Sequence, residues 1–195
     1  MDRRIVLCLC MVLAAGLVAV DVARAAPPAQ TDATVLYFED FSDPTSGWGK
    51  SANASRARYY RDGEYRLEIK QPDSSSWYAY PAEDFTDFTL EVDARLVTGP
   101  PTARYGVIFR WQDNDNFYYL RINDQGEYQL RKRLDGEWQD VAGMEWTASP
   151  HLKSAGGSNR LMVTAAGSSI TVAANGKVLT TVEDASIDAG RAGII

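Results

Sequence analysis

The stretch Tyr105-Gly-Val-Ile-Phe-Arg-Trp111, followed by the turn Asp113-Asn-Asp-Asn116 and the run Phe117-Tyr-Tyr-Leu-Arg-Ile122, decides the fold. β-branched and aromatic residues dominate both runs, and the Asp and Asn residues between them are typical of a turn. Within each run apolar residues recur at every second position, as Val107 and Phe109 do. Because strand side chains alternate between two faces, this pattern predicts a hairpin with one face in a hydrophobic core.

The same alternation assigns the individual side chains of this region to faces. The residues predicted to point inward are Tyr105, Val107, Phe109, Trp111, Tyr118, Leu120 and Ile122. Those predicted to point outward are Ile108, Arg110, Phe117, Tyr119 and Arg121. If strands that follow one another in the sequence also pair in space, one outward face carries Glu91, Asp93, Arg95, Arg110, Tyr119, Arg121 and Arg131.

The rest of the chain repeats this signature, with short apolar and aromatic runs separated by Gly, Asp and Asn turns every eight to twelve residues. Asn175-Gly176 is the strongest hairpin signal. No stretch after residue 25 predicts a substantial helix, so we expect an all-β, two-sheet antiparallel sandwich. The predicted strands are 34–41, 56–60, 64–70, 75–80, 85–97, 103–112, 116–123, 127–133, 158–166, 168–174, 177–183 and 191–195.

The N-terminal 25 residues have the three parts of a secretory signal peptide. Met1-Asp-Arg-Arg4 is net positive, Ile5–Val20 is apolar, and Ala23-Arg-Ala25 supplies the small residues of a cleavage site. A retained membrane anchor is the alternative, although a span needs about 20 apolar residues. We expect cleavage near Ala25, a flexible lead-in at 26–33, one β-sandwich domain at 34–195, and a secreted, periplasmic or cell-surface protein.

The amino-acid composition and net charge of the chain limit the classes of binding partner that we expect. The 195 residues include 26 acidic and 20 basic ones, a net charge of −6, and loss of the predicted leader leaves 24 and 17. An acidic surface argues against nucleic acids and anionic membranes, which attract clustered Lys and Arg. Cys8 and Cys10 both lie in the leader and there is one histidine, which excludes a disulfide framework and a His- or Cys-rich zinc site. The sequence leaves the oligomeric state open.

Several short motifs occur along the chain in an order that is typical of one protein superfamily. They are Phe38-Glu-Asp-Phe41 with Gly47-Trp48, Asp62–Leu67, Tyr105–Arg110 with Asp113–Tyr119, Gly126–Leu130, Asn159–Val163, and Gly167, Ile170 and Asn175-Gly176. Together they resemble the concanavalin A-like lectin/glucanase superfamily, in the branch of laminin G-like and 3-keto-disaccharide hydrolase-like domains of bacterial exported proteins. The resemblance covers about residues 35–195 and implies a two-sheet jelly roll.

The resemblance also implies one strand more than this chain supplies. Such domains continue past the region of Ala192-Gly-Ile-Ile195 with a strand that pairs near the N-terminal one. Either the domain lacks its last strand, or the sheet edge left unpaired is covered by another chain or protected by the edge strand itself.

Glu91-Val-Asp93-Ala-Arg95 bears on catalysis. Glucanases of family 16 in this superfamily carry Glu-x-Asp-x-Glu, with a nucleophile first and an acid/base last. Here the acid/base position is Arg95, and a guanidinium has no proton to give at neutral pH. We therefore predict no catalytic residues, and take Glu91 and Asp93 as members of either a ladder of cross-strand ion pairs or a ligand-binding surface.

The predicted ligand-binding residues are Glu91, Asp93, Arg110, Tyr119, Arg121 and Arg131. Sugar rings stack on aromatic side chains, and their hydroxyls form hydrogen bonds with Arg and Asp. Phe117, Trp77, Trp138 and Trp146 are further candidates, while Trp48 and Trp111 are assigned to packing. The predicted function is an exported, non-catalytic module that binds an oligosaccharide or another extracellular polymer. The alternatives are a glycoside or 3-keto-glycoside hydrolase and a laminin G-like adhesion or assembly domain.

Two acidic clusters are candidates for a structural calcium ion, because hard cations prefer oxygen ligands. They are Asp113 with Asp115, and Asp40 with Asp43. The alternative is that these side chains stabilise turns, which Asp and Asn favour.

Overall fold

The computed structural model describes residues 3–7, 34–71, 75–80, 83–154 and 156–195. Almost every regular element is a strand. The elements are β1 (Arg3–Leu7), β2 (Thr34–Glu39), β3 (Ser51–Ala52), β4 (Arg56–Arg61), β5 (Glu64–Ile69), β6 (Tyr78–Ala79), β7 (Phe88–Ala94), β8 (Tyr105–Asp113), β9 (Asn116–Ile122), β10 (Glu127–Leu134), β11 (Glu137–Asp140), the 3₁₀ turn η1 (Val141–Gly143), β12 (Thr147–Ala148), β13 (Asn159–Ala166), β14 (Ser169–Ala174), β15 (Lys177–Glu183) and β16 (Arg191–Ile194).

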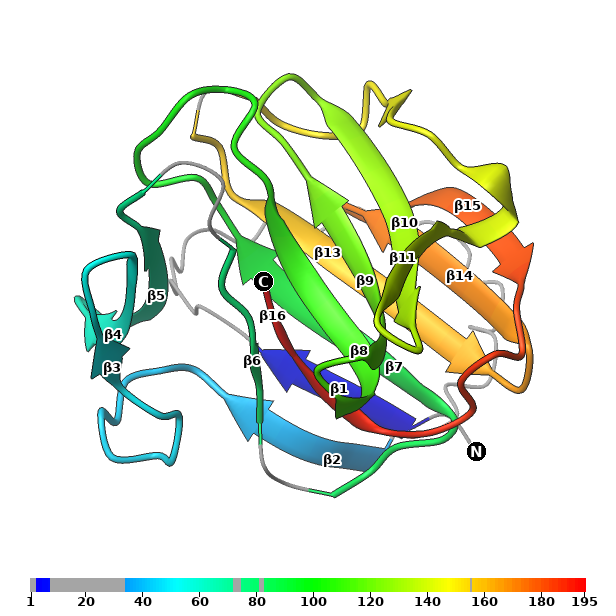
Figure 1. Cartoon of the computed structure of the whole chain (residues 1–195), viewed down its shortest axis with the longest axis horizontal. Helices are drawn as coiled ribbons and strands as arrows, with labels where there is room; N and C mark the ends of the chain where they lie inside the picture. Colours follow the sequence, from blue (N-terminus) through cyan, green and yellow to red (C-terminus); the bar gives the residue numbers. More distant parts are fainter. Residues whose placement is uncertain (1–2, 8–33, 72–74, 81–82, 155) are drawn as a thin grey trace, which may run out of the picture.

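Two large sheets face each other, as predicted (Figure 1). The front sheet has the order β11-β10-β9-β8-β16-β6, and β12 also pairs with β10. The back sheet has the order β15-β14-β13-β7-β1-β2. A small sheet of β3, β4 and β5 lies at one end of the sandwich. Apart from the pairings of β1, the strands pair antiparallel, so the all-β sandwich expected from the alternating pattern is confirmed.

The core lies between the inward faces of the two sheets. Leu90, Leu161 and Ile170 of the back sheet and Phe109 and Leu120 of the front sheet are all fully buried in it. Each such side chain stabilises the fold by about 1.5–3 kcal/mol through removal of apolar surface from water. The predicted alternation in β9 is confirmed as well, because Tyr118, Leu120 and Ile122 join this core while Phe117 and Tyr119 do not.

Three two-residue turns connect hairpins where the sequence places Asn-Gly or Asp-Gly. At Asn175-Gly176 the backbone φ angles are 51° and 77°, and Ala174 pairs with Lys177 across the turn. Asp62-Gly63 and Asp135-Gly136 also have positive φ at both residues. Positive φ at both positions gives a type I′ turn, whose twist matches that of the flanking strands.

The alternation predicted for β8 is wrong beyond Phe109. Arg110 has φ of 47°, and the pairing of β8 with β9 shifts between Phe109 and Asp113, which marks a β-bulge. One extra residue inverts the faces that follow it. Arg110 is therefore buried at the end of the sandwich, while Trp111 packs on the outward side with Ile108.

The pairing predicted for β7 is also wrong. β7 pairs with β13 and β1 in the back sheet, and β8 begins the front sheet beyond a loop at 95–104. β7 and β8 are therefore consecutive in the sequence but belong to different sheets of the sandwich. Alternation assigns a side chain to a face but does not say to which sheet that face belongs.

β1 lies between β2 and β7 and runs parallel to both. It therefore fills a position next to the N-terminal strand of the domain, where the resemblance led us to expect a gap. β1 also belongs to the predicted signal peptide, whose remaining residues and the lead-in lie outside the described part of the chain. Cleavage near Ala25 stays a prediction. In the described segments, no helix has the length and apolarity required to cross a membrane.

Candidate functional site

The structure separates the predicted ligand-binding residues into three places. Glu91 and Asp93 lie on the outer face of the back sheet, opposite Met162 and Arg160 of β13. The Asp93 carboxylate accepts hydrogen bonds of 3.0 and 2.6 Å from the Arg160 guanidinium. Arg95 in turn pairs with Glu64 at 2.6 Å. Asp93 therefore forms an ion pair, but its partner belongs to β13, because β7 pairs with β13 and not with β8.

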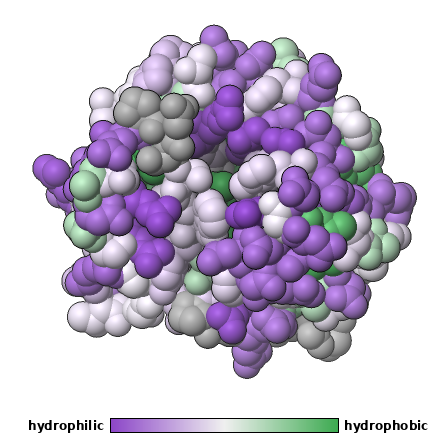
Figure 2. Space-filling view, in the orientation of Figure 1, coloured by the Kyte–Doolittle hydropathy of each residue, from purple (hydrophilic) through white to green (hydrophobic). Residues whose placement is uncertain are grey.

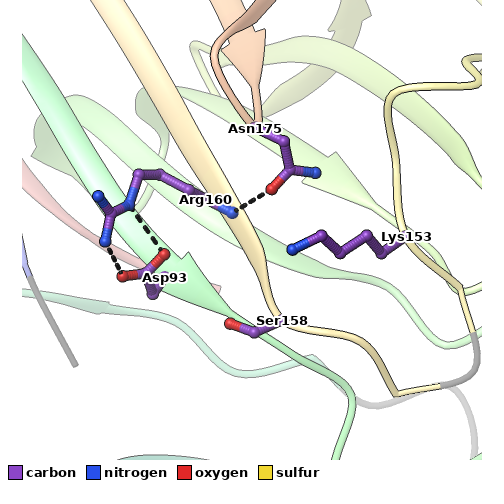
Figure 3. Close-up of a pocket in the computed structure, with 5 residues that line it drawn as sticks. All are labelled: Asp93, Lys153, Ser158, Arg160 and Asn175. Atoms are coloured by element: carbon purple, nitrogen blue, oxygen red, sulfur yellow. Dashed lines mark hydrogen bonds and ion pairs between the residues drawn. The ribbon is translucent and has the colours of Figure 1, made fainter. Parts of the chain in front are cut away.

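A polar pocket of about 350 Å³ opens beside this ion pair (Figure 3). Its described lining consists of Asp93, Lys153, Ser158, Arg160 and Asn175, and none of these side chains is aromatic. The Asn175 side chain is occupied in accepting a hydrogen bond of 3.1 Å from the Arg160 backbone. Without an aromatic ring, this described lining offers no stacking surface for a sugar ring.

Arg110 is fully buried, so its predicted place on the ligand-binding face is wrong. Its guanidinium donates hydrogen bonds to the carbonyl oxygens of Thr86, Gly167 and Ile187 at 3.0, 2.9 and 3.0 Å. Burial lowers the pKa of Arg110, and nearby Asp87 and Asp188 act in the opposite direction. Arg110 thus joins three loops at one end of the sandwich and has no free surface for a ligand.

Tyr119, Arg121 and Arg131 remain together on the outer face of the front sheet. Tyr119 packs there with Phe117 and Ile108 in a small second cluster separate from the main core. We call this surface the aromatic–arginine face and define it by Ile108, Phe117, Tyr119, Trp77, Trp138, Trp146, Arg104, Arg121, Arg131 and Arg133.

Aromatic rings form the floor and part of the walls of this face. Phe117 is fully buried, and Trp138 meets it edge-on at a centroid distance of 5.8 Å. Trp138 meets Tyr119 edge-on at 5.3 Å and remains 43% exposed. Trp77 packs against Phe117 at 5.6 Å, and its indole N–H donates to the side-chain oxygen of Asn114. The aromatic side chains are therefore held in place from below while part of their surface faces solvent.

Guanidinium groups lie among these rings. Arg121 is 5.2 Å from the Tyr119 ring centroid and 5.1 Å from that of Trp146. Arg104 is 5.6 Å from Trp146, and Arg133 is 5.1 Å from Trp138. Cation–π contacts of this kind order both partners. The face is consequently preorganised and carries both stacking surfaces and hydrogen-bond donors.

A polar network fixes Arg121. Its guanidinium donates to the Gln129 side-chain oxygen at 2.7 Å, and the Gln129 amide donates to Asp140 and to the Met144 carbonyl. Arg131 pairs with Asp140 at 2.5 Å. Burial raises the pKa of Tyr119, whereas Arg121 and Arg131 act in the opposite direction, so the phenol stays a neutral donor at physiological pH.

Figure 2 views the outer side of the front sheet and shows a hollow near the middle of this side. Hydrophobic residues are visible at its floor and hydrophilic ones surround it. Gly106 and Gly193 lie on neighbouring strands of this sheet, opposite Arg121 and Ile108 respectively. Neither has room for a Cβ, which would come within about 2 Å of a backbone oxygen in each case.

The acidic clusters considered for calcium form turns. Asp113 accepts hydrogen bonds from the Asp115 backbone and the Asn116 side chain. Asp40 accepts one from the Ser42 backbone, and Asp43 accepts one from Thr45. These bonds lower the pKa values of Asp40 and Asp43. No group of three or more His, Cys, Asp or Glu side chains suited to a metal occurs among the described residues.

Sequence reasoning missed Arg104 and Arg133 as parts of the face, and Gln129 as the residue that positions Arg121. The alternation in β10 places Gln129, Arg131 and Arg133 on one side, so the pattern held the signal for two of them. Arg104 precedes β8, and Trp146 lies in a loop between η1 and β12. No periodic pattern extends through such segments. Whether Arg104 and Trp146 lie on the same face therefore depends on how the loops fold.

Comparison with known proteins gives one family and several similar folds. The family model of the 3-keto-alpha-glucoside-1,2-lyase-like domain matches residues 38–194. No curated protein matches the chain. The carbohydrate binding module CBM66 from Bacillus subtilis has 18% identity and a TM-score of 0.60, over 76% of this chain and 86% of that one.

Two galectins are also similar in fold. Sheep galectin-11, solved in complex with glycerol, has 13% identity and a TM-score of 0.43, over 62% of this chain and 91% of that one. The galectin LEC-6 of Caenorhabditis elegans has 16% identity and a TM-score of 0.43, over 63% of this chain and 84% of that one. The likeness to CBM66 agrees with the two-sheet β-sandwich described above.

Proposed function

Because the chain belongs to the family of 3-keto-alpha-glucoside-1,2-lyase-like domains, we propose that it recognises a carbohydrate, and that the glycan lies on the aromatic–arginine face. The similarity of the fold to a carbohydrate binding module agrees with this proposal. Fold likeness alone does not specify a ligand, so the argument rests on the surface itself.

The observation that carries the proposal is the setting of Trp138. Its ring is 43% exposed, yet Phe117, Tyr119 and Arg133 all contact it. An exposed indole that is already ordered loses little side-chain entropy when a sugar ring stacks on it. Trp77 and Trp146 offer two more partly exposed rings on the same face.

The polar groups around these rings suit sugar hydroxyls. Arg121, Arg131 and Gln129 supply donors, and the Asp140 carboxylate supplies an acceptor. Hydrogen bonds to charged groups are stronger than neutral ones, and they give direction to an otherwise non-directional stacking contact. One sugar can therefore stack its ring on Trp138 and donate a hydrogen bond from a hydroxyl group to Asp140 on the same surface.

Titration calorimetry against a panel of soluble polysaccharides tests this proposal. Trp138→Ala is expected to weaken binding of the polymer that wild type recognises by several-fold to about tenfold, because a stacked aromatic contributes about 0.5–1.5 kcal/mol beyond its burial. Phe38→Ala is a matched control, since Phe38 is 52% exposed on the edge strand of the back sheet. Equal affinity in wild type and Trp138→Ala contradicts the proposal.

Catalysis on a glycoside is a second candidate, favoured by the family that the chain belongs to. Asp140 is an acid at the proposed site, where it forms an ion pair with Arg131. Turnover of glycosides and 3-keto-glycosides by wild type, abolished in Asp140→Asn, supports this candidate; no turnover of either class opposes it.

We also propose that the chain is exported after removal of its first 25 residues. The positive start, the apolar run and the Ala23-Arg-Ala25 site support this. N-terminal sequencing of the protein from its native host tests the proposal. A mature chain that begins at or near Ala26 is expected, and one that begins at Met1 contradicts it.

A further inference from the structure

The charge on the aromatic–arginine face opposes that of the chain as a whole. The chain carries a net charge of −6, whereas this face contains four arginines. Two of the four are neutralised: Arg131 pairs with Asp140 at 2.5 Å and Arg133 pairs with Asp115 at 3.1 Å. The other two, Arg104 and Arg121, have a different environment.

Arg104 and Arg121 contact neutral groups only. Both lie beside the Trp146 ring, at 5.6 and 5.1 Å from its centroid. Arg121 also contacts the Tyr119 ring and donates to the Gln129 amide oxygen. No carboxylate of the described residues lies within ion-pair distance of either guanidinium. The face thus holds two positive charges with no direct counter-charge.

The surroundings of Arg121 act against its charge. Burial lowers its pKa, and the positive charges of Arg104 and Arg131 act in the same direction, while Tyr119 and Asp140 oppose them. A guanidinium nevertheless stays protonated at any physiological pH. A partly desolvated cation beside like charges gains more from an anionic ligand than a fully hydrated one does.

Building on the proposed function, we propose that the glycan recognised by this face is acidic. A sugar oxyanion, a carboxylate or a sulfate, would pair with Arg104 and Arg121 while its ring stacks on Trp146. The planar guanidinium fork binds two oxygens of one oxyanion at once, and these bonds are stronger than those that it forms with neutral hydroxyl groups. Since the whole chain is acidic, its general field repels a polyanion, and attraction must come from this local surface.

The experiment compares each acidic polymer with a counterpart that lacks its charged groups. Titration calorimetry uses polygalacturonate and its fully methyl-esterified form, and dextran sulfate and dextran, with the full chain. We expect at least one acidic polymer to bind about tenfold or more tightly than its neutral counterpart, and added salt to weaken that binding. The sulfate and carboxylate arms show which oxyanion is preferred.

Variants locate the effect on the two arginines. Arg104 is exposed, and among the described residues its recorded contact is with the Trp146 ring, so Arg104→Gln is expected to keep the fold and to reduce the preference for the acidic polymer several-fold. Arg121→Gln is expected to reduce it about tenfold or more, and Arg121→Lys to restore part of it. Arg61→Gln is the matched control, because Arg61 is exposed on β4, where it pairs with Asp62.

The outcomes separate this inference from the proposed function. If the neutral polymers bind as tightly as the acidic ones, or if both glutamine variants keep the full preference, the inference is wrong while carbohydrate binding stands. If none of the four polymers nor any neutral glycan binds, both the inference and the proposed function are wrong. Thermal unfolding of each variant confirms that a loss of affinity is not a loss of fold.

Discussion

The Lys132 ammonium donates a hydrogen bond of 2.6 Å to the Asp184 carboxylate, and this pair joins the two sheets from within. Lys132 belongs to β10 of the front sheet, and Asp184 directly follows β15 of the back sheet. Tyr118 and Ser186 complete the network, the first by donating to the same carboxylate at 2.6 Å and the second by accepting from Lys132 at 2.7 Å. The pair is largely buried, with side chains 11% and 10% exposed.

Breaking this pair from one side should be costly. Lys132→Met leaves the Asp184 carboxylate buried without its cation, so we expect a loss of about 3 kcal/mol in the free energy of unfolding. Urea denaturation measures it. The double variant Lys132→Met/Asp184→Leu should recover part of the loss, since two apolar side chains replace two buried charges. A double variant no more stable than Lys132→Met contradicts this account.

The same network predicts an acid transition. Burial raises the pKa of Asp184, but hydrogen bonds from Lys132, Ser186 and Tyr118 outweigh it and hold the pKa well below its usual range. A carboxyl whose pKa is lower in the folded state stabilises the fold above its unfolded pKa of about 4, and that stability is lost as the pH falls further. Thermal unfolding from pH 7 to pH 2 should show this loss, reduced in Asp184→Asn.

Arg110 should matter for stability and not for binding. Arg110→Met removes hydrogen bonds to the carbonyl oxygens of Thr86, Gly167 and Ile187, and leaves those groups without their donor. We expect a loss of about 2–4 kcal/mol in the free energy of unfolding, measured by urea denaturation. Polysaccharide affinity at a temperature where the variant is folded should equal that of wild type. A folded variant with weakened binding would place Arg110 at the ligand.

The bulge at Arg110 depends on Gly190. A Cβ at Gly190 would lie 2.5 Å from the Arg110 carbonyl carbon and 2.7 Å from the Trp111 oxygen, and the backbone φ there is 150°. Gly190→Ala should therefore destabilise the fold by about 2 kcal/mol or more. Gly167→Ala is the matched control, because its φ is also positive but no atom lies within 4 Å of an added Cβ. Equal melting temperatures for the two variants contradict this reading.

The loss of β1 should expose two strands. If residues 1–25 are removed, β2 and β7 lose the hydrogen-bonding partner that lies between them. Hydrogen exchange of the backbone amides should be faster in β2 in the chain that begins at residue 26 than in the full chain. β9 is an internal reference, since its partners β8 and β10 are unaffected. Identical exchange in β2 of both chains would show that β1 does not protect it.

How far the site followed from the sequence differs from residue to residue. The aromatic and charged side of β9 was predictable, because Tyr119 and Arg121 alternate strictly with core residues on a regular strand. Arg110 was not, because a bulge inverts the alternation and burial of a guanidinium depends on three carbonyl oxygens from distant loops. Glu91 and Asp93 were assigned to an outward face correctly, but to the wrong sheet.

The sandwich, its hairpin turns and the inward side of most strands could be predicted from the sequence alone, since these depend on local conformational preference and on a period of two residues. Which strands share a sheet, and therefore which side chains share a surface, became known from the three-dimensional structure. Pairing between strands is a long-range choice that balances the burial of whole faces, and nothing in the local pattern around Asp93 or Trp146 records it.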